Sequence, residues 1–253
     1  ATMPSGLYAV RMHAGDEEYF VPFAVRLAPG QPTSDIAFLL PTASYMAYAN
    51  NRIGLDFSET EIVIGRLIQL NKSDLFQQEY PELGLSFYDL HNDGSAVYYS
   101  SRLRPIINMQ PKHMGHLGGV GSNLWQFNAD THITDWLEAT DIDYDVISDE
   151  DLHYEGLSAI EDYSVVVSST HPEYHSVEMW DAMDAYQRRG GRLMYLGGNG
   201  FYWVTSFDPD RPHVVEVRRW HGTETYEAEP GEYYHSTTGE LGGLWRHRGR
   251  PPQ

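Results

Sequence analysis

The sequence predicts an α/β fold in which helices flank a parallel sheet. Short apolar runs at 36–40, 144–147, 164–169 and 192–196 are typical of strands buried on both faces of such a sheet. Helical patterns separate the last three runs, and strands that alternate with helices at this spacing form right-handed βαβ units. We therefore expect these four runs to lie side by side in one sheet.

The chain begins with two predicted antiparallel strands. Residues 7–12 and 19–27 alternate between apolar and polar positions or run apolar, and Ala14-Gly15-Asp16 supplies the turn between them. We interpret 1–30 as extra strands or the end of an upstream β region, and 31–253 as the α/β domain. The abrupt chain ends lead us to expect a piece of a longer polypeptide.

A large irregular insertion is predicted after the first core strand, Ile36–Leu40. Residues 41–127 are rich in Tyr, Gly, Asn and His, and within them only 62–70 reads as a regular element. We expect this insertion to form a lid over the carboxyl end of the sheet.

Helices are predicted at 130–140 and 176–189, and a helical turn is predicted within 150–163. In the second helix, Ser176 is a suitable N-cap and Gly190-Gly191 ends the pattern. After the strand at 192–196, the segments 201–207 and 213–220 read as exposed antiparallel strands.

Composition excludes several functions. The chain has 17 Lys and Arg against 36 Asp and Glu, a net charge of −19, so we expect no nucleic-acid partner. No apolar run approaches the roughly 20 residues that cross a bilayer, and no signal peptide is visible, so we expect a cytoplasmic protein without a membrane partner. Cysteine is absent, which excludes thiol nucleophiles and Cys-ligated metals.

Three segments should meet in a crevice, because parallel strands place their ligands outside their carboxyl ends. These segments are Pro41–Tyr45, Thr170–Glu173 and Gly197–Gly200. Asn199 lies at the turn where class I glutamine amidotransferase-like proteins carry a cysteine. Its amide could donate a hydrogen bond to a substrate oxygen, or the segment could be a turn chosen for positive φ.

Oxygen and nitrogen donors suggest a metal site near this crevice. Glu173 could ligate, and His171 could ligate or transfer a proton, although both could belong to an ordinary solvated loop. Most of the tyrosines are expected to serve packing. Phenols ligate only when a strongly Lewis-acidic cation such as Fe(III) lowers their pKa, and Tyr48, Tyr88 and Glu173 together would match its charge.

Two other interpretations remain open. The first is a zinc site drawn from four residues, His113, His116, Asp130 and His132. The second is a phosphate-binding loop at 118–121, which the lack of a preceding strand disfavours, and no phosphate-loop, H-E-x-x-H or G-x-S-x-G motif is present.

Long motifs resemble one known family over nearly the whole chain. They include PTASYMAYAN, GLSFYDLHNDGSAVYYSSRLRPIINM, SSTHPEYHS and GGRLMYLGGNGFYWVTSF. The sequence is similar to the large (β) subunits of N,N-dimethylformamidases. The resemblance is weakest between residues 51 and 79.

The resemblance implies a class I glutamine amidotransferase-like α/β fold without the catalytic cysteine. It implies hydrolysis of N,N-dimethylformamide to dimethylamine and formate, with one mononuclear iron held by Tyr48, Tyr88 and Glu173. His171 and Asn199 would face the substrate. Tyr45 is the alternative to Tyr48 as the iron ligand. The implied partners are a small amide substrate, a small subunit and further copies of the large subunit.

In the implied reaction, Fe(III) acts as a Lewis acid, Asn199 donates to the oxygen and His171 moves the proton. Candidates for an aromatic lid are Tyr45, Phe87, Tyr98 and Trp125. An inactive assembly module, or an amidase for another small amide, is the alternative.

Overall fold

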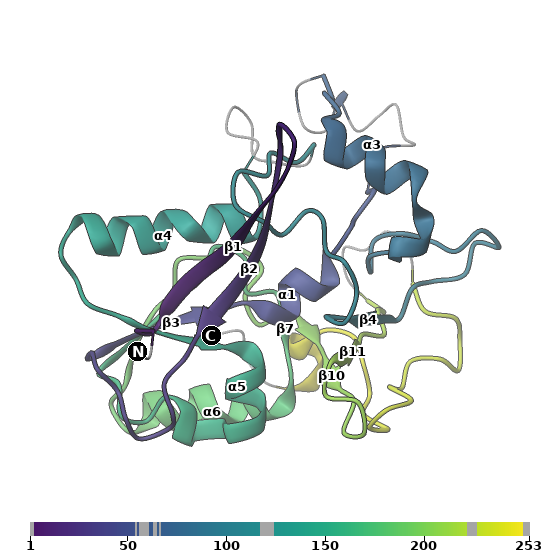
Figure 1. The fold of residues 1–253 in the computed structure, drawn as a ribbon. Helices are drawn as coiled ribbons and strands as arrows, with labels where there is room; N and C mark the ends of the chain where they lie inside the picture. Colours follow the sequence, from purple (N-terminus) through teal and green to yellow (C-terminus); the bar gives the residue numbers. More distant parts are fainter. Residues whose placement is uncertain are drawn as a thin grey trace.

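The structure is a computed structural model that describes residues 3–53, 55, 61–62, 65, 67–116, 124–221 and 227–249 (Figure 1). At its centre lies a four-stranded, all-parallel sheet in the order β5-β3-β6-β8. Its strands are β5 (Asp145–Ser148), β3 (Ile36–Leu40), β6 (Val165–Ser168) and β8 (Arg192–Met194). The predicted α/β architecture with a parallel sheet is therefore confirmed, while an amidotransferase-like topology stays a prediction.

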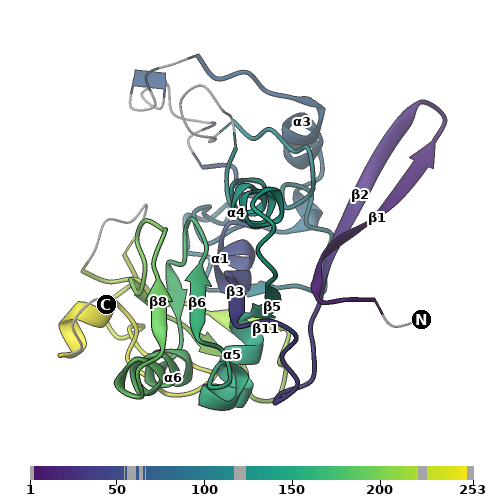
Figure 2. The same ribbon diagram turned by 90° about the vertical axis from the view of Figure 1, so that its left-hand side faces the viewer.

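Helices cover both sides of this sheet. Figures 1 and 2 show α4 (Phe127–Ala139) on one side and α5 (Asp149–Glu155) with α6 (Val177–Arg188) on the other. In α6 the Ser176 hydroxyl accepts the N–H of Met179, which is the predicted N-cap. The predicted helices are confirmed, although α4 begins three residues before 130, and a short 3-10 helix follows α5 at Gly156–Ala159.

The prediction of a buried strand at 192–196 was wrong in two respects. β8 ends at Met194, and it lies at the edge of the sheet, where it pairs only with β6 among the described strands. Met194, Tyr195 and Leu196 are 38–43% exposed. An apolar run has the same sequence signature at an edge as in the centre of a sheet, and the order of strands decides its burial.

The later strands were predicted to be exposed, and they are buried. They are β9 (Trp203–Val204), β10 (Ser206–Phe207) and β11 (Val214–Glu216). β10 and β11 are antiparallel as predicted, and β11 also pairs with β4 (Tyr99–Ser101) from the insertion. β9 instead pairs in parallel with β7 (Tyr174–His175). The insertion and the C-terminal segment, with its 3-10 helix Trp245–Arg248, cover these strands.

The insertion at 41–127 is more regular than predicted. It contains α1 (Thr42–Ala47), α3 (Lys72–Glu79), a 3-10 helix (Pro81–Leu83) and β4. The element predicted at 62–70 lies partly outside the described residues, and 67–70 has no regular structure. Residues 118–121 also lie outside them. Six-residue α1 is too short to give a periodic sequence signal.

The predicted N-terminal hairpin is confirmed. β1 (Gly6–Ala14) pairs with β2 (Glu17–Val25) in antiparallel register across a turn in which Gly15 has φ 61°. Figure 2 shows the hairpin standing away from the sheet. The division into units 1–30 and 31–253 stays a prediction. None of the described helices combines the length and apolarity needed to cross a bilayer.

Candidate functional site

The three segments predicted to converge do meet at the carboxyl ends of the core strands. The Glu173 N–H donates to Ser44 Oγ of α1 over 3.1 Å, and the Gly198 N–H donates to the Thr170 carbonyl over 3.0 Å. Gly197 is required here, since a Cβ would lie 2.7 Å from the carbonyl oxygen of Ser169. The predicted convergence of the three segments is thus confirmed.

Tyr48 is the C-cap residue of α1, and its side chain points toward Glu173. The helix follows β3 directly, so the residue after it is held close to the sheet edge, and Tyr48 is 6% exposed. Its phenol oxygen lies 2.7 Å from Glu173 Oε2 and 2.5 Å from the phenol oxygen of Tyr88.

Tyr88 reaches the same point from a turn in the insertion. Asp89 Oδ2 accepts both the N–H and the hydroxyl of Ser86 at 2.8 Å, and the Phe87 N–H donates to the Ala47 carbonyl over 2.9 Å. These bonds fasten the turn to α1, and the rings of Tyr48 and Tyr88 stack with centroids 4.3 Å apart. The Tyr88 oxygen lies 3.1 Å from Glu173 Oε2.

The two carboxylate oxygens of Glu173 have different surroundings. Oε1 accepts the indole N–H of Trp203 at 3.1 Å, while Oε2 faces both phenols and also lies 3.1 Å from His171 Nε2. The side chain is 4% exposed. One oxygen is therefore anchored and the other is presented to the phenols, and we name Tyr48, Tyr88 and Glu173 the oxygen cluster.

His171 and Trp125 border the oxygen cluster. His171 Nε2 lies 3.5 Å from the Tyr48 oxygen, and the ring of Trp125 packs against His171 and Tyr48 with centroid distances of 4.9 and 5.6 Å. His171 is 9% exposed. An imidazole in this position can exchange a proton with a molecule bound at the cluster.

Electrostatics distinguish the carboxylate from the phenols. Burial, followed by the negative charge of Glu173, raises the pKa of Tyr48 well above its ordinary value, and burial likewise raises the pKa of Tyr88. Burial also opposes ionisation of Glu173, but bonds from His171 and Tyr48 outweigh it and lower its pKa. Without a cation the cluster thus holds one carboxylate and two neutral phenols.

The oxygen cluster fits a hard, strongly Lewis-acidic cation. Three oxygen donors approach one another within 3.1 Å, and phenols become anionic ligands only when such a cation offsets their burial. Among the described residues no group of three or more His, Asp or Glu side chains could hold a metal. A site at this position therefore depends on its tyrosines.

The zinc interpretation is wrong, because no three His, Asp or Glu side chains among the described residues are placed to hold a metal ion. Asp130 Oδ2 accepts the phenol of Tyr45 at 2.5 Å and its Oδ1 accepts the Thr170 N–H at 2.6 Å, whereas His116 contacts Asp74 and the Ile53 carbonyl. The structure thus also places Tyr45 on Asp130 and away from the oxygen cluster.

Asn199 lies on the exposed turn after β8, with φ 54°. Its neighbour Gly198 approaches His171, since a Cβ there would lie 3.8 Å from His171 Nδ1. Within the described part of the chain, the Asn199 side chain makes no hydrogen bond. Its role as a donor to substrate stays a prediction.

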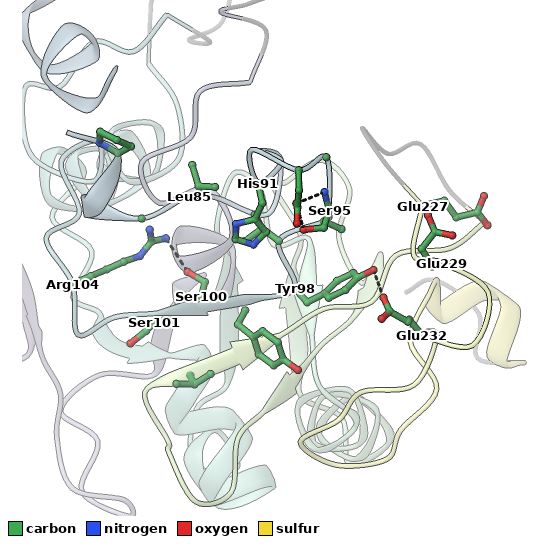
Figure 3. Close-up of a pocket in the computed structure, with 18 of the residues that line it drawn as sticks. Leu85, His91, Ser95, Tyr98, Ser100, Ser101, Arg104, Glu227, Glu229 and Glu232 are labelled. Atoms are coloured by element: carbon green, nitrogen blue, oxygen red, sulfur yellow. Dashed lines mark hydrogen bonds between the residues drawn. The ribbon is translucent and has the colours of Figure 1, made fainter. Parts of the chain in front are cut away.

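Of the four lid candidates, only Trp125 lies against His171 and Tyr48. Tyr45 is bound to Asp130, Phe87 is fully buried, and Tyr98 donates to Glu232 over 2.8 Å. The last contact belongs to a separate cavity of about 1210 Å³, whose lining includes His91 (Figure 3). None of the three oxygen-cluster residues lines that cavity.

Three contributors were missed by the sequence analysis. Tyr174 lies 2.7 Å from the Tyr88 oxygen, Arg219 donates to Tyr174, and Trp203 binds Glu173. The sequence contained a sign that Arg219 is buried. Val215, Val217 and Arg219 alternate with period two, so the arginine lies on the apolar face of the predicted strand. No comparable signal marked Trp203.

Asp130 gives a pH-dependent prediction. Burial raises its pKa from 3.8 to about 6, so its contribution to stability is fully present below pH 3.8 and is lost as pH rises through 6. Asp130→Asn removes this dependence. We therefore expect the unfolding free energy of the variant minus that of wild type to be more positive at pH 8 than at pH 4, by up to about 3 kcal/mol.

Urea unfolding at the two pH values measures this difference. Asp135→Asn, an exposed position on the same helix, controls for the loss of a charge. If the unfolding free energies of Asp130→Asn and wild type differed by the same amount at both pH values, the raised pKa of Asp130 would be contradicted.

Comparison with known proteins agrees with the resemblance in the sequence. The profile of the family described as "N,N-dimethylformamidase beta subunit-like, C-terminal" matches residues 1–253. The chain is 41% identical over 257 residues to the N,N-dimethylformamidase beta subunit of Paracoccus aminophilus and 40% identical to that of an Alcaligenes species. Each match covers 100% of this chain and 33% of the relative, so the chain spans about a third of their length. The chain therefore belongs to the N,N-dimethylformamidase beta subunit-like, C-terminal family.

Proposed function

We propose that the chain carries the active site of an amidohydrolase that converts N,N-dimethylformamide to dimethylamine and formate. A mononuclear Fe(III) would be held by Tyr48, Tyr88 and Glu173. The observation that carries this proposal is the approach of three buried oxygen donors from separate segments to within 3.1 Å of one another. The names of the two relatives support the substrate.

The charges of the oxygen cluster support iron in its trivalent state. Two phenolates and one carboxylate carry three negative charges, which balance Fe(III) in a buried site. Divalent magnesium or calcium does not normally lower the pKa of a phenol enough to bind it as phenolate.

When bound, Fe(III) would supply Lewis acidity to the amide oxygen and to the attacking water. His171 would take a proton from water as its oxygen bonds to the formyl carbon. It would return that proton to nitrogen as the C–N bond breaks, which releases dimethylamine and formate. Asn199 would donate to the substrate oxygen.

Trp125 suits a tertiary amide. Its ring covers His171 and Tyr48 and presents an apolar surface, and N,N-dimethylformamide offers methyl groups and no N–H at its nitrogen. By excluding water, the Trp125 ring would strengthen the polar interactions at the oxygen cluster.

We also propose that the protein assembles with a small subunit and with further copies of its own subunit. The name "beta subunit" of the relatives supports this. One face of the hairpin adds support, because Val10, Met12, Val21 and Phe23 are 40–52% exposed there. The same face favours the alternative of an inactive assembly module.

Metal content and the visible spectrum of one purified sample test the proposal. We expect one iron per chain, a phenolate-to-iron charge-transfer band, and release of dimethylamine from N,N-dimethylformamide. Colourless protein without stoichiometric iron would favour the assembly module. A panel of formamides and acetamides separates the proposed substrate from another small amide.

A further inference from the structure

A fully buried arginine lies behind the oxygen cluster. Arg219 follows β11 and is 0% exposed. Its guanidinium carbon lies 4.1 Å from the ring centroid of Tyr88 and 5.3 Å from that of Trp203. Burial of a cation is costly unless it interacts with its surroundings, so the contacts of Arg219 indicate what its charge stabilises.

Arg219 holds the Tyr88 turn at two points. One N–H donates to the Phe87 carbonyl oxygen, which belongs to the residue before Tyr88. The guanidinium also lies over the Tyr88 ring. The backbone and the ring of the same turn are thus fixed by one rigid, planar group.

Tyr174 completes a link from Arg219 to the cluster. Arg219 Nη2 donates to the Tyr174 phenol oxygen over 2.5 Å, and this oxygen lies 2.7 Å from that of Tyr88. Since the Tyr174 oxygen accepts from the arginine, its own proton is available for Tyr88. Tyr174 is 0% exposed, so no solvent replaces this bond.

We propose that Arg219 and Tyr174 are positioning residues that hold the Tyr88 phenol oxygen in the oxygen cluster and stabilise negative charge on it. This inference rests on the proposed iron site. Outer hydrogen-bond partners of metal ligands typically change metal affinity or activity about 10- to 100-fold when they are removed.

The proposal predicts a spectroscopic signature. A cation over the ring and a hydrogen bond to its oxygen both lower the energy of the electrons on a Tyr88 phenolate. Charge transfer to iron then requires more energy. Loss of either group should move the visible band to longer wavelength, which a purely structural defect would not do.

Tyr174→Phe and Arg219→Met test the proposal in the purified protein. We expect a band shifted to longer wavelength and iron lost to a hydroxamate chelator about tenfold faster than from wild type. Tyr174→Phe removes only a hydroxyl, so it keeps the test valid if Arg219→Met does not fold.

Matched controls exist for both variants. Tyr186→Phe removes a buried phenol that donates to the carbonyl of Tyr163, which precedes β6, and Arg218→Met removes a buried arginine that lies over Tyr98. Both should keep the wild-type band. Iron-bound wild type with unchanged Tyr174→Phe and Arg219→Met spectra would overturn this inference alone, whereas wild type without iron would overturn the proposed function as well.

Discussion

Replacing Glu173 with Gln is expected to abolish both iron binding and amide hydrolysis. The carboxylate is the one member of the oxygen cluster that is anionic before a cation arrives, because bonds from His171 and Tyr48 hold its pKa down against burial. An amide of the same shape keeps an oxygen near Trp203 but removes that charge. Loss of several kcal/mol of metal-dependent stabilisation lowers kcat/KM by on the order of a thousandfold or more.

Iron analysis, the visible spectrum and dimethylamine release measure this effect together. Glu82→Gln, the same substitution at an exposed position, is the control and should behave as wild type. Retention of stoichiometric iron by Glu173→Gln would contradict the assignment of this carboxylate as a ligand.

The chemistry of phenols made Tyr48 and Tyr88 candidate ligands among many tyrosines, and the resemblance selected them. Their segments follow no common period, since Tyr48 ends a six-residue helix and Tyr88 lies in a turn fixed by Asp89 and Ser86. Glu173 was easier to predict from the sequence, because strand order alone places the segment after β6 where the three segments meet. The rule for parallel sheets therefore predicted where the three segments meet, whereas the choice of Tyr48 and Tyr88 as proposed ligands rested on the resemblance.

Arg219 belongs to a segment that the sequence analysis predicted to be exposed and that the structure buries. The segment 213–220 alternates as an exposed strand would, with polar residues between apolar ones. In the structure β4 and the C-terminal segment cover it, so Glu216 and Arg218 are buried as an ion pair and Arg219 lies over the ring of Tyr88. Contacts between separate segments, such as the pairing of β11 with β4, decide this burial, and local sequence patterns do not contain them.

The edge position of β8 likewise depends on how the strands pair, which local sequence patterns do not contain. Nothing in the run at 192–196 distinguishes a central strand from an outer one, and its exposure follows from pairing with β6 on one side only among the described strands. This edge leads into Gly197–Gly200, so the turn that carries Asn199 is bordered by solvent on one side and by the 170–172 loop on the other.

Replacing His171 with Gln is expected to separate catalysis from metal binding. The imidazole lies 3.1 Å from Glu173 Oε2 and 3.5 Å from the Tyr48 oxygen, close enough to move a proton for a molecule bound at the cluster. Gln can still donate a hydrogen bond to Glu173 but cannot act as a base. General acid–base catalysis contributes about 10²- to 10⁴-fold, so kcat should fall by that factor while the charge-transfer band remains.

The division between kcat and iron content makes the His171 prediction specific. Removal of a proton-transfer group lowers kcat and kcat/KM together, whereas removal of a ligand lowers iron occupancy first. His153→Gln, which alters a histidine bound to Ser176 away from the cluster, should leave both unchanged. If His171→Gln lost iron in parallel with activity, His171 would be a ligand and the proton would need another carrier. An unchanged kcat would exclude it from proton transfer.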